Sequence, residues 1–559
     1  MSGLNVSRRT FVEGGIAASA VAALAACGKK DDSAATSSNA GSEASSGSAS
    51  KGNVIKYYIT NPVAIDPYNA QETQGMQVTQ ALYDSLTGFD WDAGKVVPKA
   101  AESWDVSDDA KVFTFHLVKD AKFHNGDPVD AASFKRGWER ICDPTMSTPS
   151  VIAYHLNPIK GAEEMQEGKA KEIEGVKVVD DLTLEVTLKE PMAEFPYICT
   201  HDALAPVPQA ALDDPEGFAV APIGNGPFKM DGKWVSDQYI NLVRFDDYYG
   251  TPAKIDGIYF SIQKDPATAF REFEAGNIDF TDIPAGRIQE LEGKYGTSED
   301  GYTVNPGKQV LKGEEAGVYW LTVNVNDEVL KDLTLRQAIS LAINRQNIVD
   351  TVFEGTRLPA TCVFPTPIDD DPSNAWEFCK YDKEAAIKLL DEKYPADDKG
   401  KRGIKLTLSY NSGGDHEDIM SCVQGDLEAV GIECEQSSME WAAYLSAMGD
   451  GTVQIGRMGW NADFPIMDNF IYPNFLTTSE NNYSKYSNKE LDEGLVEARK
   501  ILDEEKRKAA YRELNAMIGK DLPVIPLMYY AHNNVGSERL KNLYYNPQTK
   551  ADFEKAEFA

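Results

Sequence analysis

Residues 406–457 read LTLSYNSGGDHEDIMSCVQGDLEAVGIECEQSSMEWAAYLSAMGDGTVQIGR, and this stretch decides the fold. Apolar residues alternate with polar ones in three short segments and recur at helical spacing in the two segments between them. The pattern predicts strands at 406–410, from 432 and at 453–457, with helices at 419–430 and 441–448. Consecutive βαβ units cross over with a right hand, so they build a parallel sheet whose loops line a ligand crevice at the carboxyl ends of the strands. We therefore expect an α/β fold with a binding crevice at this edge of the sheet.

The third strand runs directly into Arg457-Met458-Gly459-Trp460-Asn461-Ala462-Asp463. Gly459 would let another backbone approach closely, Trp460 offers a flat apolar wall, and Asp463 supplies a negative charge at the crevice edge. Together these residues suit a small extended molecule that carries a cationic amine. In the alternative interpretation, which spacing alone favours, Gly459 turns the chain, Trp460 packs in the core and Asp463 caps the next segment.

The N-terminal residues predict an exported protein that is held to a membrane by lipid. Ser7-Arg8-Arg9-Thr10-Phe11-Val12 resembles the twin-arginine export signal, and the apolar run from Ile16 to Ala26 has 11 residues. A helix needs roughly 20 apolar residues to span a bilayer, so this run is a removable signal. It ends in Leu24-Ala25-Ala26-Cys27, and a segment rich in Ser, Ala and Gly follows. We predict an export signal with a lipobox at 1–26, lipidation of Cys27, and a flexible tether at 27–53. A coincidental cysteine beside an ordinary secretion signal is the alternative.

Length, charge and cysteine content limit the number of domains and the kinds of ligand and metal site. Removing 26 residues from 559 leaves 533, too many for one hydrophobic core and suited to two or three domains. The formal net charge of −33 argues against a nucleic-acid partner, because nothing in the chain would displace counterions from phosphate. Six cysteines follow Cys27, and none has the CxxC spacing of a redox or zinc site. We expect Cys422 and Cys434 to be near neighbours, either as a disulfide or as core thiols.

Two further blocks are patterned. Phe113, Phe115 and Leu117 alternate as a strand, Asp130 precedes a helix as its cap, and strands are predicted at 176–179 and 184–188. This block is typical of a small α+β unit. Later in the chain, Thr334 and Gln337 have the spacing of a capping box at the start of a helix.

Short segments in a fixed order along nearly the whole mature chain resemble one family. They are Ile65-Asp66-Pro67, LYDSL at 82–86, PKAAESW at 98–104, FTFHL at 113–117, KFHNGDPV at 122–129, Trp138-Glu139-Arg140, NGPF at 225–228, LRQA at 335–338, AINR at 342–345 and GWNAD at 459–463. Each segment on its own is weak evidence for a family, but the order and spacing of all of them together are specific. Together they resemble the family 5 extracellular solute-binding proteins of ABC importers, in particular the oligopeptide-binding branch.

The resemblance implies a periplasmic-binding-protein-like α/β fold of two lobes joined by hinge crossovers, with an extra small α+β domain. Lobe I is expected to hold 54–90, 222–322 and 535–559, the extra domain 91–221, and lobe II 323–534. The βαβαβ stretch falls inside lobe II, so the residue pattern and the resemblance place the crevice wall in the same segment.

The resemblance also implies a function: capture of a short extended peptide between the lobes and its delivery to the permease and ATPase subunits of an importer. Asp463 would receive the α-ammonium of the peptide, while backbone of Gly459 to Asn461 and of Val63, Ala64 and Ile65 would bond its amides. Trp460 and Tyr529 or Tyr530 would flank ligand side chains. The residue that receives the ligand carboxylate stays open among Arg457, His416 and Arg345. The protein is expected to be a monomer outside the cytoplasm that needs no cofactor or metal.

Other interpretations remain. Phe464-Pro465 departs from the oligopeptide branch, so a dipeptide or another solute such as a metal chelate is an alternative ligand. A haem carrier also stays open because the fold admits it, and a peptide-sensing receptor stays open because the sequence does not distinguish sensing from import. An exported hydrolase is the main alternative from another class. Against an enzyme, the chain contains no GxSxG elbow, no HExxH motif and no glycine-rich phosphate loop.

Overall fold

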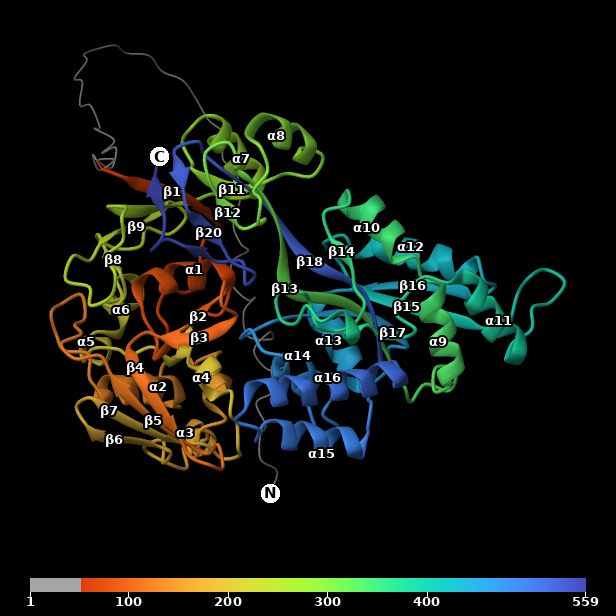
Figure 1. Ribbon diagram of the computed structural model, residues 1–559, viewed down its shortest axis with the longest axis horizontal. Helices are drawn as coiled ribbons and strands as arrows, with labels where there is room; N and C mark the ends of the chain where they lie inside the picture. Colours follow the sequence, from red (N-terminus) through yellow and green to blue (C-terminus); the bar gives the residue numbers. More distant parts are fainter. Residues whose placement is uncertain (1–51) are drawn as a thin grey trace, which may run out of the picture.

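The computed structural model describes residues 52–559. The twin-arginine segment, the lipobox, Cys27 and all but the end of the tether lie outside these described residues. Two lobes sit on either side of a pair of long strands that both lobes share (Figure 1). Among residues 52–559, no helix has both the length and the apolar character needed to cross a membrane.

The shared strands are β13 (Val310–Val323) and β18 (Val524–Gly536). They are antiparallel, with Val310 opposite Val535 at one end and Thr322 opposite Val524 at the other. They form the centre of one sheet of 11 strands with the order β16-β15-β17-β13-β18-β11-β1-β10-β9-β8, and β14 pairs with β18 beside this path. The register shifts between Glu314 and Val318, which bends the sheet where it passes from one lobe to the other.

Lobe I closes around the N-terminal strand and the C-terminal segment. Tyr57 stacks on Phe280 with ring centroids 5.3 Å apart, and Phe553 meets the same tyrosine edge-on. Its strands are β1 (Val54–Ile59), β8 (Phe228–Met230), β9 (Tyr239–Arg244), β10 (Gly257–Ile262), β11 (Phe280–Asp282), β12 (Thr303–Val304), β19 (Leu540–Lys541), β20 (Leu543–Tyr545), β21 (Ala551–Asp552) and β22 (Glu557–Phe558). Its helices are α1 (Thr73–Leu82), α5 (Ala210–Asp213), α6 (Pro215–Val220), α7 (Pro266–Glu274) and α8 (Ile288–Tyr295). Helices α5 and α6 fall within the range expected for the extra domain, but Ala211 and Phe218 pack in the lobe I core.

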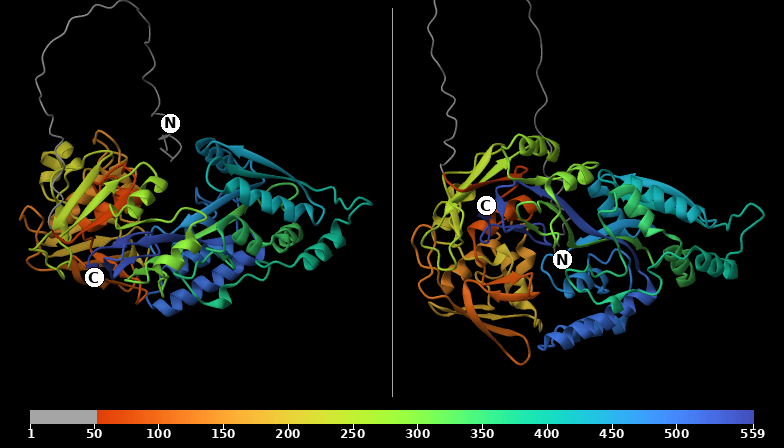
Figure 2. Two further views of the ribbon diagram at one scale, coloured as in Figure 1. Left: turned by 90° about the horizontal axis from the view of Figure 1, so that it is seen from above. Right: turned by 45° about the horizontal axis from the view of Figure 1, so that its top comes forward.

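The extra domain is an antiparallel sheet covered by short helices (Figure 2). Phe113 and Phe115 are fully buried, as their alternation predicts, and Asp130 accepts a hydrogen bond from the backbone N–H of Ser133 in a capping box. The sheet order is β4-β5-β7-β6. Its elements are β4 (Ala101–Val106), β5 (Val112–Leu117), β6 (Val176–Asp180), β7 (Thr183–Thr187), α2 (Ala131–Cys142), α3 (Ala162–Gln166) and α4 (Phe195–Ile198), with the hairpin β2 (Thr87–Asp90) and β3 (Lys95–Pro98) beside them.

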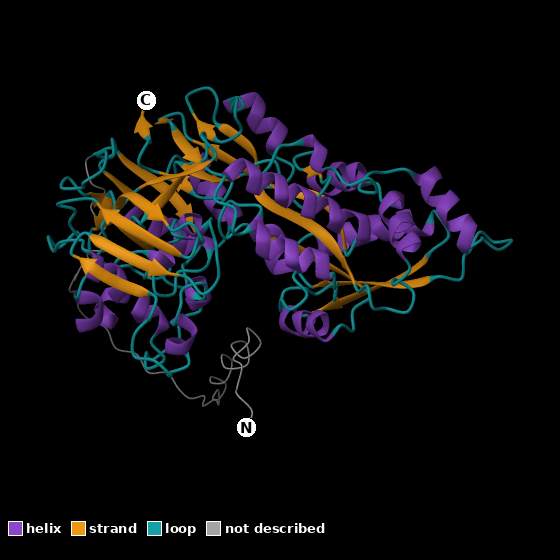
Figure 3. Ribbon diagram, turned by 60° about the horizontal axis from the view of Figure 1, so that its bottom comes forward, coloured by secondary structure: helices purple, strands orange, loops and turns teal. Residues whose placement is uncertain are grey.

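Lobe II contains the predicted βαβαβ unit, with β15 parallel to both β16 and β17. The predicted parallel sheet is confirmed for these three strands only, because β17 pairs antiparallel with β13. The unit consists of β15 (Lys405–Asn411), α12 (His416–Glu428), β16 (Glu433–Met439), α13 (Trp441–Asp450) and β17 (Ile455–Asn461). Around it lie α9 (Leu333–Ala342), α10 (Arg345–Phe353), β14 (Leu358–Pro359), α11 (Lys383–Lys393), α14 (Asp468–Phe475), α15 (Lys489–Ala498) and α16 (Glu504–Asp521), as Figure 1 shows. Figure 3 distinguishes the helices of the molecule from its strands by colour.

Two local predictions in lobe II have different outcomes. The expected capping box of Thr334 and Gln337 is wrong, because the N-cap of α9 is Asp332, whose side chain accepts a hydrogen bond from the Thr334 N–H. Cys422 and Cys434 pack at the edge of the same core cluster. All six cysteines of the described residues are free thiols.

Gly317 marks the point where β13 leaves the bulge and begins to pair with β17, opposite Asn461. A Cβ at this position would overlap the side-chain oxygen of Asn461 and the ring of Tyr530. The close approach of these two side chains to the β13 backbone therefore requires glycine.

We predict that Gly317→Ala lowers the free energy of unfolding by about 1–3 kcal/mol, because the added methyl group displaces Asn461 or Tyr530. Chemical denaturation of the purified protein measures the change. The matched control is Gly425→Ala on α12, where a Cβ has no neighbour within 4 Å and alanine is the better helix former by about 0.5–1 kcal/mol. A Gly317→Ala protein that is as stable as the wild type would contradict the prediction.

Candidate functional site

A cavity of about 510 Å³, here called the interlobe cavity, lies where both lobes, the extra domain and the bulge of β13 meet. The lining residues come from five segments: Gln71, Thr73 and Met76 of lobe I; Tyr154, His155 and His201 of the extra domain; Glu315 and Ala316 of β13; Gly459 to Asp463 of lobe II; and Pro547 to Lys550 of the C-terminal segment. The cavity therefore touches every part of the fold that a hinge motion would move.

The loop after β17 is held from two directions. Asn469 at the start of α14 accepts hydrogen bonds at its Oδ1 from the indole N–H of Trp460 at 2.9 Å and the backbone N–H of Asp463 at 3.0 Å. Its Nδ2 donates to the Asp463 carboxylate at 3.3 Å. From the C-terminal segment, the Gln548 side chain donates to the carbonyl oxygens of Ala462 and Asp463, each at 3.1 Å. The Asp463 carboxylate and the Trp460 ring are thus fixed beside the cavity.

Neither Asn469 nor Gln548 was predicted from the sequence. Asn469 lies beyond the patterned strand, and Gln548 reaches the loop from a segment 85 residues away. No local pattern identifies either residue, because each acts through contacts that the fold creates.

Gly459 needs to be glycine because of this chain's own packing. A Cβ at this position would overlap the Tyr530 hydroxyl and lie 2.8 Å from the carbonyl oxygen of Val318. Gly459 lies within β17 and pairs with Tyr319, so it does not turn the chain. Asp463 does not cap α14 either, because the N-cap of that helix is Met467.

The extra domain contributes an aromatic wall to the interlobe cavity. The rings of His155 and His201 have centroids 4.0 Å apart, and Phe464 meets His155 edge-on at 6.1 Å. Burial lowers the pKa of His201 well below its ordinary value, and nearby His155 and Lys550 lower it further, so this imidazole is uncharged at neutral pH. Its Nδ1 accepts a hydrogen bond from the Ala203 N–H at 3.0 Å.

The structure brings some of the predicted site residues together and leaves others apart. Asp463, Trp460, Gly459 and Asn461 line the interlobe cavity. Val63, Ala64 and Ile65 are not among the lining residues: the Val63 side chain is 80% exposed, and Ile65 is buried in the lobe I core. Tyr529 is buried in the lobe II core, where its hydroxyl accepts from the backbone N–H of Thr361 at 3.2 Å.

The three candidates for binding a ligand carboxylate have different surroundings. Arg345 is buried, and its guanidinium donates to the carbonyl oxygens of Pro526 at 2.7 Å and Ser340 at 3.0 Å. Arg457 donates to the side chain of Asn411 and lies 5.2 Å over the Trp441 ring. Burial, Arg457 and Arg357 together lower the pKa of His416 to about 4, so this ring is neutral at physiological pH.

Arg357 was not predicted from the sequence as a candidate for binding the ligand carboxylate, although it acts on His416 together with Arg457. Its guanidinium lies 3.7 Å from the Phe353 ring centroid and 5.2 Å from that of Tyr530. Across residues 52–559, no carboxylate comes within ion-pair distance of Arg357 or Arg457. Lobe II therefore carries two cations that lack an anionic partner within the described chain, although neither is among the residues that line the interlobe cavity.

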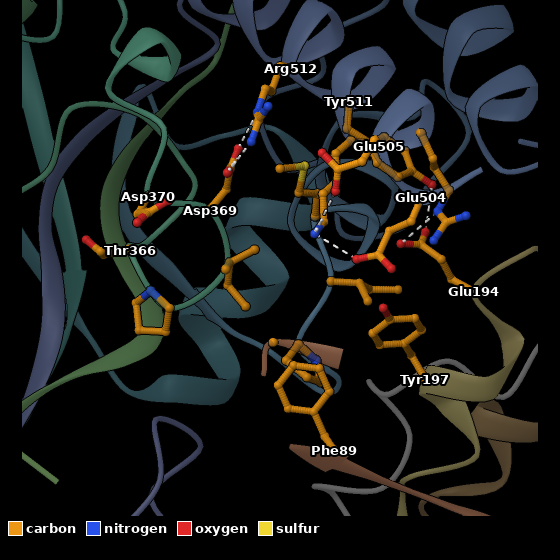
Figure 4. Close-up of a pocket in the computed structure, with 18 residues that line it drawn as sticks. Phe89, Glu194, Tyr197, Thr366, Asp369, Asp370, Glu504, Glu505, Tyr511 and Arg512 are labelled. Atoms are coloured by element: carbon orange, nitrogen blue, oxygen red, sulfur yellow. Dashed lines mark hydrogen bonds and ion pairs between the residues drawn. The ribbon is translucent and has the colours of Figure 1, made fainter. Parts of the chain in front are cut away.

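A second cavity of about 260 Å³, here called the α16 cavity, lies between the extra domain and α16 (Figure 4). Its charged groups pair with one another: Arg512 binds both oxygens of Asp369 at 2.7 Å, and Arg507 lies 3.2 Å from Glu194. Because these charges already have partners, we interpret the α16 cavity as part of a contact between domains. Within the described residues, no group of three metal-ligating side chains is close enough to hold a metal ion.

The contact beside the α16 cavity contains two buried carboxyl groups that share one hydroxyl. Tyr511 Oη lies 2.9 Å from Glu194 of the extra domain and 3.2 Å from Asp468 of lobe II. Arg499 binds Asp468 through two nitrogens, and its carbonyl oxygen accepts from the Ala193 N–H at 2.8 Å. A hydroxyl has one proton, so both carboxyl contacts are hydrogen bonds only when one carboxyl is protonated. Burial raises the pKa of Glu194 to about 7. The positive charge of Arg507 lowers this pKa, and the negative charge of Asp468 raises it.

Comparison with known proteins places this chain in a family. Residues 95–482 match the family described as bacterial extracellular solute-binding proteins, family 5 Middle. The periplasmic oligopeptide-binding protein OppA of Haemophilus influenzae is 28% identical over 486 residues, which cover 84% of this chain and 87% of that protein. A crystal structure of H. influenzae OppA in complex with RPPGFSPFR matches with a TM-score of 0.67 at 26% identity, covering 90% of this chain and 99% of the other.

The unliganded open form of the murein tripeptide-binding protein MppA matches with a TM-score of 0.79 at 24% identity. This match covers 91% of this chain and 98% of that chain. It concerns the fold alone, and it confirms the predicted two-lobed architecture with an extra antiparallel domain.

The shared proton at Glu194 leads to a prediction about pH. The folded protein holds this proton up to about pH 7, while an unfolded glutamate releases it near 4.5, so the stabilising contribution is lost as the pH rises between these values. We predict that Glu194→Gln, which cannot ionise, gains stability relative to the wild type between pH 5 and pH 8, by at most about 3 kcal/mol. Denaturation at both pH values measures this.

Glu190→Gln is the control for that experiment, because the Glu190 side chain is 81% exposed. Its stability should follow the wild type at both pH values. A difference between Glu194→Gln and the wild type that does not change with pH would contradict the shared proton.

Proposed function

The chain belongs to the family 5 bacterial extracellular solute-binding proteins, and from this premise we propose that it captures short peptides between its lobes and delivers them to an ABC permease for import. Capture is reversible and leaves the peptide intact. Cys27 carries the lipid that keeps the protein at the membrane, and the segment that follows lets the two lobes reach the permease.

The observation that carries the peptide proposal is the order of charges along the cleft. The Asp463 carboxylate lines the interlobe cavity. On the lobe II wall, the Tyr530 ring separates this cavity from Arg357 and lies close to Gly459. A peptide carries a positive amine at one end and a negative carboxylate at the other. Attraction of the amine to Asp463 and of the carboxylate to Arg357 would orient the peptide with its N-terminus at Asp463.

Asp463 is the proposed acceptor of the α-ammonium. Asn469 and Gln548 hold its loop in place, which reduces the entropy that is lost when a ligand binds. A charge-assisted hydrogen bond in such a partly dry site contributes about 1.5–3 kcal/mol.

Arg357 and Arg457 are the proposed donors to the ligand carboxylate. Both lack an anionic partner among the described residues, whereas Arg345 is committed to carbonyl oxygens inside lobe II. His416 lies beside them as a neutral ring and would contribute a hydrogen bond without charge. Lobe closure about the Glu314 to Val318 bulge would bring the exposed Val63 and its neighbour Ala64 toward the peptide as the opposite wall.

We predict that Asp463→Asn weakens the binding of free-amine peptides by about 10- to 100-fold and leaves N-acetylated peptides nearly unchanged, because only the former present an ammonium group. Isothermal titration calorimetry with each pair of peptides measures the ratio. Asp418→Asn is the control, since Asp418 is exposed on α12 and does not line the cavity. Equal losses for both classes of peptide would remove Asp463 from this role.

A second prediction concerns the other end of the peptide. Arg357→Gln and Arg457→Gln should each lower the affinity for free-acid peptides by about tenfold and should affect C-terminally amidated peptides much less. Arg345→Gln should instead lower the melting temperature, because it removes donors from buried carbonyl oxygens. If amidated and free-acid peptides respond alike, the carboxylate lies elsewhere.

A further inference from the structure

Glu315 occupies a special place in the fold. It lies in the bulge of β13 and lines the interlobe cavity together with Gly459, Trp460 and Asp463. The preceding residue, Glu314, is bonded elsewhere: its carboxylate accepts a hydrogen bond from the backbone N–H of Thr366 at 2.7 Å, and Thr366 lines the α16 cavity. The chain thus carries two adjacent glutamates of which only Glu315 faces the cleft.

The Glu315 carboxylate accepts no hydrogen bond and forms no ion pair with any residue between 52 and 559. Arg357 attracts it only from beyond ion-pair distance, since that guanidinium lies over Phe353 and Tyr530. Lys550 also lines the cavity, and its positive charge lowers the pKa of His201 and of Asp202 in the extra domain. Burial raises the pKa of Glu315 to about 7, and the negative charge of Asp282 adds to this rise, while Arg357 lowers it. A cation that entered the cavity would relieve this cost.

A small side pocket of lobe I adjoins the interlobe cavity, with Thr73 and Thr549 lining both spaces. Its polar groups include Asp282 at the end of β11 and Asn534 of β18, which pairs with it. The Asn534 amide nitrogen donates to the Asp282 carboxylate at 2.7 Å, which leaves the amide oxygen on the other side. That oxygen is buried, in a residue that is only 2% exposed, and it has no hydrogen-bond partner among the described residues.

The pocket therefore offers acceptors, and neither lysine nor arginine is among the residues that line it. A carboxylate stands at the cavity, a second carboxylate and an unsatisfied amide oxygen lie in the pocket, and tyrosine rings, including Tyr57 and Tyr545, form the walls. An ammonium or guanidinium group on an aliphatic stem is the ligand chemistry that satisfies acceptors of this kind while its stem packs against aromatic walls. An anionic or purely apolar side chain would leave these acceptors unpaired.

We propose that Glu315, Asp282 and Asn534 form a specificity subsite that receives a lysine or arginine side chain of the bound peptide. This inference rests on the proposed peptide-binding function and adds to it a preference for basic cargo. Because Asp463 is the proposed acceptor of the α-ammonium, the subsite makes a second, independent contact with positive charge.

Calorimetry with four tripeptides tests the proposal: Lys-Ala-Ala, Ala-Lys-Ala, Ala-Ala-Lys and Ala-Ala-Ala. At least one of the lysine peptides should bind the wild type about tenfold or more tightly than Ala-Ala-Ala. Glu315→Gln and Asp282→Asn should each remove most of this preference and leave the affinity for Ala-Ala-Ala within about twofold. Glu314→Gln is the matched control and should keep the preference.

A charge reversal adds a measurement that misfolding cannot imitate. Glu315→Lys should bind a peptide with glutamate at the favoured position more tightly than the lysine peptide, which inverts the order seen for the wild type. Two results would overturn the inference: a wild type without preference for any lysine peptide, or Glu315→Gln weakening Ala-Ala-Ala as much as the lysine peptides. Failure of all four peptides to bind would instead count against the proposed peptide-binding function itself.

Discussion

The antiparallel pairing of β13 with β18 is the constraint on which the rest of the structure depends. Because both strands belong to one sheet that runs through both lobes, the lobes cannot separate without breaking backbone hydrogen bonds. The pairing is irregular between Glu314 and Val318 and again between Tyr319 and Trp320, and the first irregularity, which leaves the longer stretch of β13 unpaired with β18, is where we expect the lobes to move. The candidate binding loop is built on the same irregularity, since β17 begins its pairing with β13 at Gly317. The expected hinge and the candidate site therefore share one piece of structure, so a ligand on the loop would also contact the hinge.

Buried charges that hold the domains together differ from those near the interlobe cavity in whether they have a partner of opposite charge. Away from the cavity, two largely buried arginines each bind a carboxylate: Arg140 binds both oxygens of Asp66, and Arg499 binds both oxygens of Asp468. Glu315 at the interlobe cavity, and Arg357 and Arg457 in lobe II, are partly buried and have no opposite charge within ion-pair distance among the described residues. Unpaired, partly desolvated charges reduce stability, and proteins concentrate such local costs at sites where a ligand supplies the missing partner.

Much of the fold and part of the candidate site followed from local pattern. The alternation and helical spacing in 406–457 gave β15, α12, β16, α13 and β17 in order, and the loop that follows contains Asp463 and Trp460 at the cavity. The errors are also local: Asp332 and Thr334 both satisfy the rules for a helix cap, and only the backbone path decides for Asp332. Tyr529 and Tyr530 differ for a related reason. Neighbouring residues on a strand face opposite sides, so Tyr529 enters the lobe II core while Tyr530 lies beside Gly459 and Arg357.

The sequence by itself determined the order of strands and helices, the family resemblance, and the loop that carries the negative charge of Asp463, because these depend on residues close together in the chain. Only the tertiary structure decided which distant residues meet. Asn469 and Gln548 fix the loop. The pairing of β11 with β18 brings Asp282 and Asn534 together in a side pocket that adjoins the interlobe cavity, and Glu315 of β13 lines that cavity. The physical reason is that hydrogen bonding and burial depend on distance in space, and the register of the shared strands sets that distance.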